Sequence, residues 1–306
     1  MSIYVEISIR GTLDELRRRT QVPVLHERWD LRFTSIEYLE RADDSPVQLF
    51  RYSTRIGFGR KIEGWGEMVG ERLDANARAS ALKFGSDDPR SLISSGFGYW
   101  KFEQIGEELR FVTGFDYDVR WGLIGRVFDC LFFRPLLGWA TAWSFDRLRL
   151  WIEQEKEPQQ AARQALIHAV AATALAFLWT WQGLVPKLWA LHSAEVELSL
   201  ATGIPESMAP WLLRVLGAAE VVFGLAYPFF ARRGWPWLLT AGSMAVGLLV
   251  VLTAAPDLVQ GPFSPLVLNF SMAALAVIGL MSLRDLPSAR RCLRRPTKEQ
   301  PEENRT

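Results

Sequence analysis

An uncharged run of about 21 residues, from Ala165 to Val185, constrains this chain more than any other feature of its sequence. At 1.5 Å of rise per helical residue, such a run matches the roughly 30 Å hydrocarbon core of a bilayer. Arg163 precedes the run and Lys187 follows it. The run therefore predicts a membrane-spanning helix that separates two unlike halves of the chain.

Three more apolar runs of about 20 residues follow, which predicts four spans in all. Of the 306 residues, those before 157 are rich in charge, whereas residues 160–283 carry only about ten charged side chains. We therefore expect a soluble domain, a linker, a membrane domain and a basic tail whose end is disordered. The expected ranges are 1–155, 156–164, 165–284 and 285–306, with spans at 165–185, 211–230, 235–255 and 264–283.

Basic residues gather on one set of connections between these runs. Arg232 and Arg233 separate the second and third runs, and several arginines follow the last run, whereas the opposite connections carry only Lys187. By the positive-inside rule, both termini are expected in the cytoplasm. The first residues also lack a signal-peptide pattern, so we expect a multi-pass protein of the cell (inner) membrane.

In the first half, Ile3, Val5, Ile7 and Ile9 alternate with polar residues, as in a strand with one buried face. Several similar runs follow and predict an antiparallel sheet of about five to seven strands. From Trp121 to Glu155 the apolar period becomes helical, which predicts a long amphipathic helix bent at Pro135. The fold class is therefore α+β helix-grip, followed by an all-α transmembrane four-helix bundle.

Several kinds of site are disfavoured by the sequence. The net charge is +1, which argues against a nucleic-acid partner. Cys130 and Cys292 lie far apart and outside any metal-ligand spacing, so we interpret both as ordinary thiols. The histidines are scattered, and we expect packing or surface roles for them. We predict no metal site and identify no catalytic residue.

The run from Gly114 to Asp129, leading into the helix at 146–153, resembles the SRPBCC superfamily of START-like and polyketide-cyclase-like proteins. The resemblance covers residues 1–155 and implies a cavity for an apolar ligand between the sheet and the long helix. Aromatic residues on such strands line a pocket or simply fill the core. The candidate ligand-binding residues in this half are Tyr52, Trp65, Tyr99, Phe102 and Phe115.

The segment TWQGLVPKL (residues 180–188), together with Gly217 to Gly224 around Glu220, resembles the DoxX-like family of four-helix membrane proteins. The resemblance covers residues 165–283. It implies a redox-associated role, because the family name comes from a thiosulfate:quinone oxidoreductase subunit. The cofactor that this resemblance implies is therefore a quinone. The sequence itself shows no evident cofactor motif for flavin, haem or an iron–sulfur cluster.

Polar residues in the membrane half suggest a second candidate site. A charge in mid-span is costly, so Glu220 should face the bundle interior, where Gly217 and Gly224 allow close helix contact. The alternatives are snorkelling for the basic residues, interhelical hydrogen bonding for the amides and a structural role for the acid. Counted from the span ends, Gln182, Arg214 and Asn269 lie at similar depths near the outer leaflet, on the side where Lys187 follows the first span, so we expect these polar groups to converge. The candidate ligand-binding residues in this half are Gln182, Lys187, Arg214, Glu220 and Asn269.

These observations favour a membrane-bound binding protein without intrinsic activity, in which the soluble domain holds a hydrophobic small molecule and the bundle holds a quinone-like one. One alternative is a DoxX-type subunit of a quinone-linked oxidoreductase, which would need a membrane redox partner. Another is a membrane-anchored cyclase-like enzyme. The expected partners are the bilayer, a hydrophobic small molecule and either a redox partner or further copies of the chain.

Overall fold

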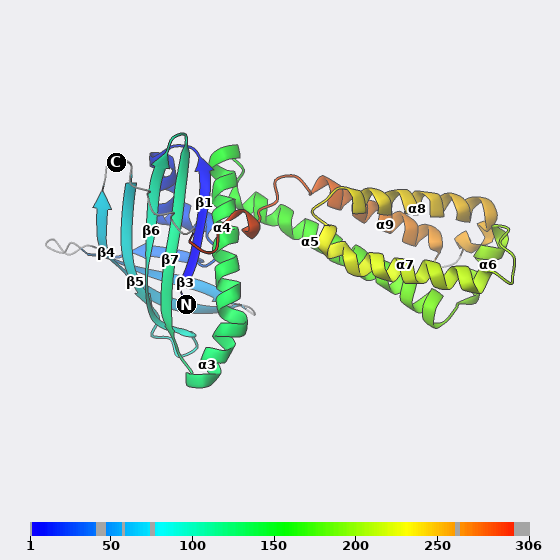
Figure 1. Cartoon of the computed structure of the whole chain (residues 1–306), viewed down its shortest axis with the longest axis horizontal. Helices are drawn as coiled ribbons and strands as arrows, with labels where there is room; N and C mark the ends of the chain where they lie inside the picture. The colour runs from blue at the N-terminus through cyan, green and yellow to red at the C-terminus, as the bar shows by residue number, and fades with distance from the viewer. Residues whose placement is uncertain (1, 41–46, 57–58, 74–76, 261–263, 297–306) are drawn as a thin grey trace, which may run out of the picture. The chain divides into compact units, whose positions relative to one another are not determined.

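The computed structural model describes residues 2–40, 47–56, 59–73, 77–260 and 264–296 (Figure 1). The chain divides into two compact units. The N-terminal unit contains Met1–Ala162 and also Pro287–Thr306, and the helical unit contains Arg163–Leu286. Along the sequence, the helical unit is therefore inserted between the two segments that form the N-terminal unit.

The N-terminal unit is built on one antiparallel sheet with seven strands in its described part, in the order β1-β7-β6-β5-β4-β3-β2. Helices α1 (Leu13–Gln21) and α2 (Pro23–Trp29) connect β1 to β2. The observed sheet and the long helix after β7 confirm the predicted helix-grip fold. The strands are β1 (Ile3–Arg10), β2 (Ser35–Tyr38), β3 (Gln48–Ile56), β4 (Arg60–Leu73), β5 (Ala77–Gly85), β6 (Ile93–Ile105) and β7 (Glu108–Val119).

The alternating pattern of β1 produces one face of the core. Val5 and Ile9 are completely buried, and Ile7 lies opposite Phe111 of β7. Phe111 stacks on Phe145 of the long helix with 4.3 Å between ring centroids. Aromatic stacking adds to the burial of apolar area, so this contact fastens the helix to the sheet.

The predicted helix from Trp121 to Glu155 is present in three consecutive pieces. They are α3 (Gly122–Phe128), a π-helical turn η1 (Asp129–Phe133) and α4 (Arg134–Gln154). Pro135 lies in the first turn of α4, where its missing N–H is tolerated. A π turn stands immediately before α4, next to the position at which the sequence predicted a bend.

The chain after the helical unit returns to the N-terminal unit. A short turn η4 (Ala289–Arg291) packs on α4, and Glu6 and Leu293 exchange two backbone hydrogen bonds of 2.9 Å. The Cys292 thiol donates to the Ala142 carbonyl over 3.2 Å. This docking was not foreseen for the tail at 285–306, and the disorder predicted for its end falls at 297–306, outside the described residues. The linker predicted at 156–164 is mostly helical, because α5 begins at Pro158.

Among the described residues, three helices are long and apolar enough to cross a membrane: Pro158–Trp189, Ala209–Phe230 and Trp235–Ala254. The fourth predicted span corresponds to a shorter apolar helix, Pro265–Met281, of 17 residues. Helix α8 packs along α9, and α7 packs against η2. The elements are α5 (Pro158–Gln182), η2 (Gly183–Trp189), α6 (Ser193–Ala201), α7 (Ala209–Phe230), α8 (Trp235–Ala254), η3 (Pro256–Gln260) and α9 (Pro265–Met281).

Candidate functional site

The N-terminal unit contains a cavity of about 260 Å³ between the sheet, the α1–β2 segment and the start of the long helix. Its walls are mainly apolar and aromatic, and Arg32 is the one charged residue among the described residues that line it. The aromatic side chains of the wall are those of Phe33, Tyr38, Phe50, Tyr52, Phe84, Tyr99, Trp100, Phe115 and Phe133.

Two glycines of β4 make room for aromatic rings of this wall. Gly64 pairs with Tyr52 across the strands, and Gly66 pairs with Phe50. A Cβ atom at either glycine would collide with the ring opposite, so the rings of β3 lie directly over β4. The Tyr52 hydroxyl donates to the Gly85 carbonyl over 3.1 Å, and burial raises the pKa of Tyr52 to about 12. Tyr52 therefore serves as a fixed, neutral wall of the cavity.

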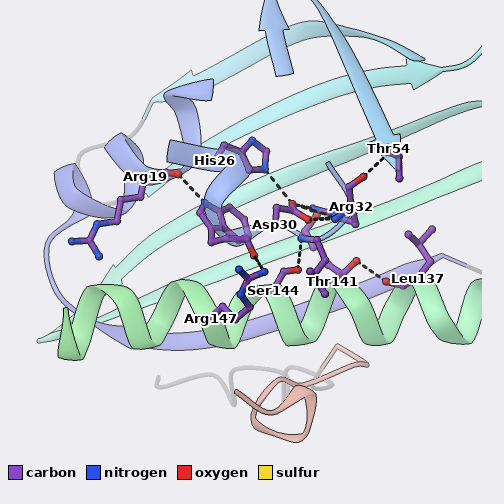
Figure 2. Close-up of polar contacts among 12 residues, drawn as sticks. Arg19, His26, Asp30, Arg32, Thr54, Leu137, Thr141, Ser144 and Arg147 are labelled. Atoms are coloured by element: carbon purple, nitrogen blue, oxygen red, sulfur yellow. Dashed lines mark hydrogen bonds and ion pairs between the residues drawn. The ribbon is translucent and has the colours of Figure 1, made fainter. Parts of the chain in front are cut away.

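A buried polar cluster contributes two side chains to the cavity wall, and Figure 2 shows its contacts. His26 and Arg32 both line the cavity, whereas Asp30 lies behind them and is only 1% exposed. Arg32 donates from Nε to Asp30 Oδ1 over 2.9 Å and from Nη2 to Oδ2 over 2.6 Å. His26 Nε2 lies 3.1 Å from the same Oδ2. One buried carboxylate thus holds both polar side chains in place.

Electrostatics keep Asp30 ionised. Burial alone would raise the pKa of Asp30, but the charge of Arg32 and the hydrogen bonds from His26 and Arg32 outweigh it and lower the pKa below its usual range. The guanidinium is thus half of a neutral, bidentate pair. Because no described residue bonds Arg32 Nη1 or His26 Nδ1, both atoms remain available to a molecule in the cavity.

The backbone that carries this cluster is fixed from two sides (Figure 2). Thr54 of β3 donates to the Arg32 carbonyl over 2.6 Å. Ser144 of α4 accepts from the Leu31 N–H over 2.9 Å, and Arg147 donates to the Trp29 carbonyl over 3.1 Å. Burial lowers the pKa of Arg147 to about 10, so it remains a cation at neutral pH. The cluster is therefore rigidly supported before any ligand arrives.

Three of the five residues predicted for this half, Tyr52, Tyr99 and Phe115, line the cavity. The structure does not bring the other two to it. Trp65 packs over Gly85 and is 37% exposed, while Phe102 is stacked on Phe111 within the core. Sequence reasoning missed the cluster of His26, Asp30 and Arg32, because the segment HERWDLRF has the charge density of an ordinary surface turn.

The helical unit holds a buried ion pair at one of the predicted positions. Lys187 Nζ lies 2.9 Å from Glu220 Oε2 and 3.4 Å from the Gln182 carbonyl, and Glu195 Oε1 lies 3.7 Å away. Lys187 is 6% exposed and is presented by the π-helical segment η2, which contains Pro186. Lys187, Glu220 and Gln182 are thus brought together.

Close helix contact shields this pair, as predicted. A Cβ on Gly217 would lie 2.8 Å from the Gly183 carbonyl oxygen, and one on Gly224 would lie 2.9 Å from that of Ala176. The backbones of α7 and the α5–η2 segment therefore touch on both sides of Glu220, which confirms the role expected for the two glycines.

The other two residues predicted for the helical unit lie elsewhere within it. Arg214 is exposed on α7. Asn269 of α9 packs against Gly247 of α8, where a Cβ would approach its amide nitrogen to 3.0 Å. The structure therefore does not form the convergence of Arg214 and Asn269 with Lys187 that the helix depths suggested.

Comparison with known proteins identifies the class of protein to which the chain belongs. Residues 176–277 match the model of the DoxX-like family, so the chain is a membrane protein that joins a DoxX-like domain to a helix-grip domain. It belongs to the family of the Bacillus subtilis (strain 168) protein YndG, described as an uncharacterized membrane protein. The two are 45% identical over 201 residues, which cover 65% of this chain and 75% of YndG.

Solved structures that resemble the chain include a STAR-related lipid transfer protein from Xanthomonas axonopodis, at 10% identity and a TM-score of 0.37 over 49% of this chain and 85% of that one. The Zhui aromatase/cyclase from Streptomyces sp. R1128 matches at 16% identity and a TM-score of 0.32, over 39% of this chain and 68% of that one. Likenesses this distant carry no argument about ligand or activity. The helix-grip assignment follows from the sheet order and the long helix.

Proposed function

We propose that the N-terminal unit binds a hydrophobic small molecule that carries one hydrogen-bond-accepting oxygen. The observation behind this proposal is the apolar cavity with Arg32 and His26 in its wall. Ligand sites typically combine apolar walls with a few fixed polar groups, and span roughly 300–1,000 Å³. At about 260 Å³, this cavity favours a single compact ring system or one acyl chain over a lipid with two chains.

The Nη1 atom of Arg32, which no described residue bonds, indicates that the polar end of the ligand accepts a hydrogen bond. A hydrogen bond to a charged group contributes about 1.5–3 kcal/mol, or roughly 10- to 150-fold in affinity. A carboxylate or ketone oxygen would accept this bond, whereas a protonated amine has no lone pair with which to accept it. We therefore expect the full-length protein to bind dodecanoic acid more tightly than dodecylamine.

A pair of neighbouring residues on β5 offers a matched test. Leu82 lines the cavity, and its neighbour Lys83 is exposed. Leu82→Trp should fill the cavity and abolish displacement of a fluorescent fatty acid by dodecanoic acid. Lys83→Trp should retain it. Equal binding by both variants of the detergent-solubilised protein would refute a ligand site in this cavity.

The His26–Asp30 pair favours the cyclase-like alternative for the same cavity. A carboxylate that accepts a hydrogen bond from one imidazole nitrogen leaves the other nitrogen of His26, a residue of the cavity wall, as a proton acceptor. Replacement of His26 by Phe separates the two functions. It should leave affinity for dodecanoic acid within a few-fold if the unit only binds, and it should abolish turnover if the unit is an enzyme.

We also propose that the protein crosses the membrane four times with both termini in the cytoplasm. Ala162 and Pro287 belong to the same N-terminal unit, so the helical unit begins and ends on one side of the membrane and crosses it an even number of times. With three helices long enough to span, this parity supports α9 as the fourth crossing. By the positive-inside rule, the arginines after α9 and between α7 and α8 favour the cytoplasmic side of the cell membrane for these two connections. A reporter after Thr306 that is active only outside the cell would contradict this arrangement.

A second ligand site, for a quinone-like molecule in the helical unit, is supported by the charge buried at Lys187 and Glu220. The 3.7 Å contact with Glu195 is the longest of the three that Lys187 makes, so a ligand carbonyl could replace it. Glu220→Gln should then weaken ubiquinone binding, with the exposed Glu197→Gln as control. A redox role would further require quinone reduction with a partner subunit, and unchanged binding in Glu220→Gln would remove this proposal.

A further inference from the structure

The segment between β7 and the middle of α4 exposes an unusual apolar surface. Six large side chains on α3, η1 and the first turn of α4 are each between 51% and 80% exposed. We call this surface the α3 face, and it consists of Leu123, Ile124, Val127, Leu131, Phe132 and Leu136. Water-soluble surfaces rarely leave so many neighbouring apolar side chains uncovered, so the α3 face indicates a partner.

The inner side of this segment explains why the apolar side chains point outward. Gly125 packs against the Arg120 carbonyl, where a side chain would not fit. Asp129 accepts hydrogen bonds from the Tyr117 hydroxyl over 2.6 Å and from Arg134 Nε over 2.8 Å. Polar contacts therefore help to hold the segment against the sheet. The exposure of the α3 face follows from this attachment.

We propose that the α3 face docks onto the surface of a lipid bilayer. The N-terminal unit is joined at both of its chain connections to a membrane domain, so a bilayer is always within its reach. Between residues 121 and 140 the only acid is Asp129, which is buried, whereas Arg126 is exposed. The segment itself thus offers an exposed cation to anionic headgroups and no exposed carboxylate between residues 121 and 140.

Two aromatic residues frame the α3 face in a way that suits the same partner. Trp121 precedes α3 and is 50% exposed, and Trp139 lies one turn beyond Leu136 and is 44% exposed. Tryptophan is enriched where membranes meet water, and amphipathic helices that lie in that interface combine such residues with basic ones. Phe133 and Leu137, on the inner side of the same segment, line the cavity, so docking would bring one cavity wall to the lipid.

The chain already contains a reporter for this contact. Cys130 is exposed within η1, and Cys292 is buried. The full-length protein, labelled at Cys130 with the environment-sensitive dye NBD, would be reconstituted into vesicles of phosphatidylcholine and phosphatidylglycerol. We expect lipids with a nitroxide on the acyl chain to quench the dye, and aqueous iodide to quench it several-fold less than a control label. The control places the same dye at Phe97→Cys, an exposed position on β6, in a Cys130→Ser background.

Two other outcomes would overturn the proposal. Iodide quenching equal to the Phe97 control would mean that the face is in water. Protection from both quenchers would mean that protein covers it, for example a second copy of the chain. As a further check, Ile124→Glu with Leu131→Glu should raise iodide quenching to the control level. Both side chains are exposed, so the fold should persist, and cavity binding of a fluorescent fatty acid verifies this.

Discussion

Asp30 and Asp88 form the same ion pair in two different environments, which allows a sharp test of burial. Each carboxylate is bound by the arginine two residues later, from Nε to Oδ1 over 2.9 Å and from Nη2 to Oδ2 over 2.6 Å. The Asp30 side chain is fully buried and Arg32 is 13% exposed, whereas Arg90 is 60% exposed. Replacing each aspartate by asparagine therefore removes the same arginine contacts from unequal surroundings, and Asp30 alone also loses its contact with His26.

We expect Asp30→Asn to lower the free energy of unfolding of the N-terminal unit by about 3–5 kcal/mol, because the charge of Arg32 is left without its buried partner. With a urea dependence of about 1–3 kcal/mol per molar, the unfolding midpoint should fall by at least about 1 M. Asp88→Asn should change it little, because solvent screens the exposed pair. Labelling of the buried Cys292 in a Cys130→Ser background reports unfolding of this unit within the full-length chain.

The same pair predicts a pH dependence. The pKa of Asp30 is lowered on folding, so the stability that its ionised form provides is present above the unfolded pKa of about 3.9 and is lost as the pH falls toward the folded pKa. The difference in stability between wild type and Asp30→Asn should therefore narrow below about pH 4. Equal midpoint shifts for the Asp30 and Asp88 variants, or a pH-independent difference, would refute the role given to burial.

Two further predictions concern packing and thiol chemistry. Gly224→Ala should lower the thermal stability of the helical unit in detergent, since its Cβ would lie 2.6 Å from the Thr180 nitrogen, whereas Gly242→Ala on α8 meets nothing within 4 Å and should be neutral. In lipid-free detergent solution at pH 8, Cys130 should react rapidly with a thiol reagent, because its side chain is exposed. Cys292, whose pKa burial raises to about 12, should be on the order of 10⁻⁴ thiolate and react only after the tail undocks or the unit unfolds. Similar rates for the two cysteines, measured in the single-cysteine variants, would show that the tail is not docked.

The parts of the fold that depend on local pattern could be predicted from the sequence. The alternation in β1 and the long uncharged runs are set by the geometry of strands, helices and bilayers. Glu220 was also placed correctly inside the helical unit, because a charge in an apolar helix has few other options. In the N-terminal unit, three of five candidate residues reached the cavity, since strand alternation indicates a face but not which part of that face remains uncovered.

The polar part of the cavity wall could not be predicted in the same way. Asp30 is buried because α4 and β3 close over the turn that carries it, through Ser144 and Thr54, and these segments are more than 20 residues away in sequence. Helix depth placed Arg214 and Asn269 at a level similar to Gln182, but only rotation about the helix axis decides which neighbour a side chain meets. Such information lies in the tertiary packing.

The pairing of Glu6 with Leu293 has a consequence for how the molecule is assembled during synthesis. Strand β1 lies at the edge of the sheet, and Leu293, which pairs with it there, follows the described apolar helices of the helical unit in the sequence. The backbone groups of Glu6 that bond Leu293 therefore stay open until the helical unit has been synthesised. A chain whose synthesis stops before residue 293 would leave these groups at the sheet edge, where they can pair with another chain.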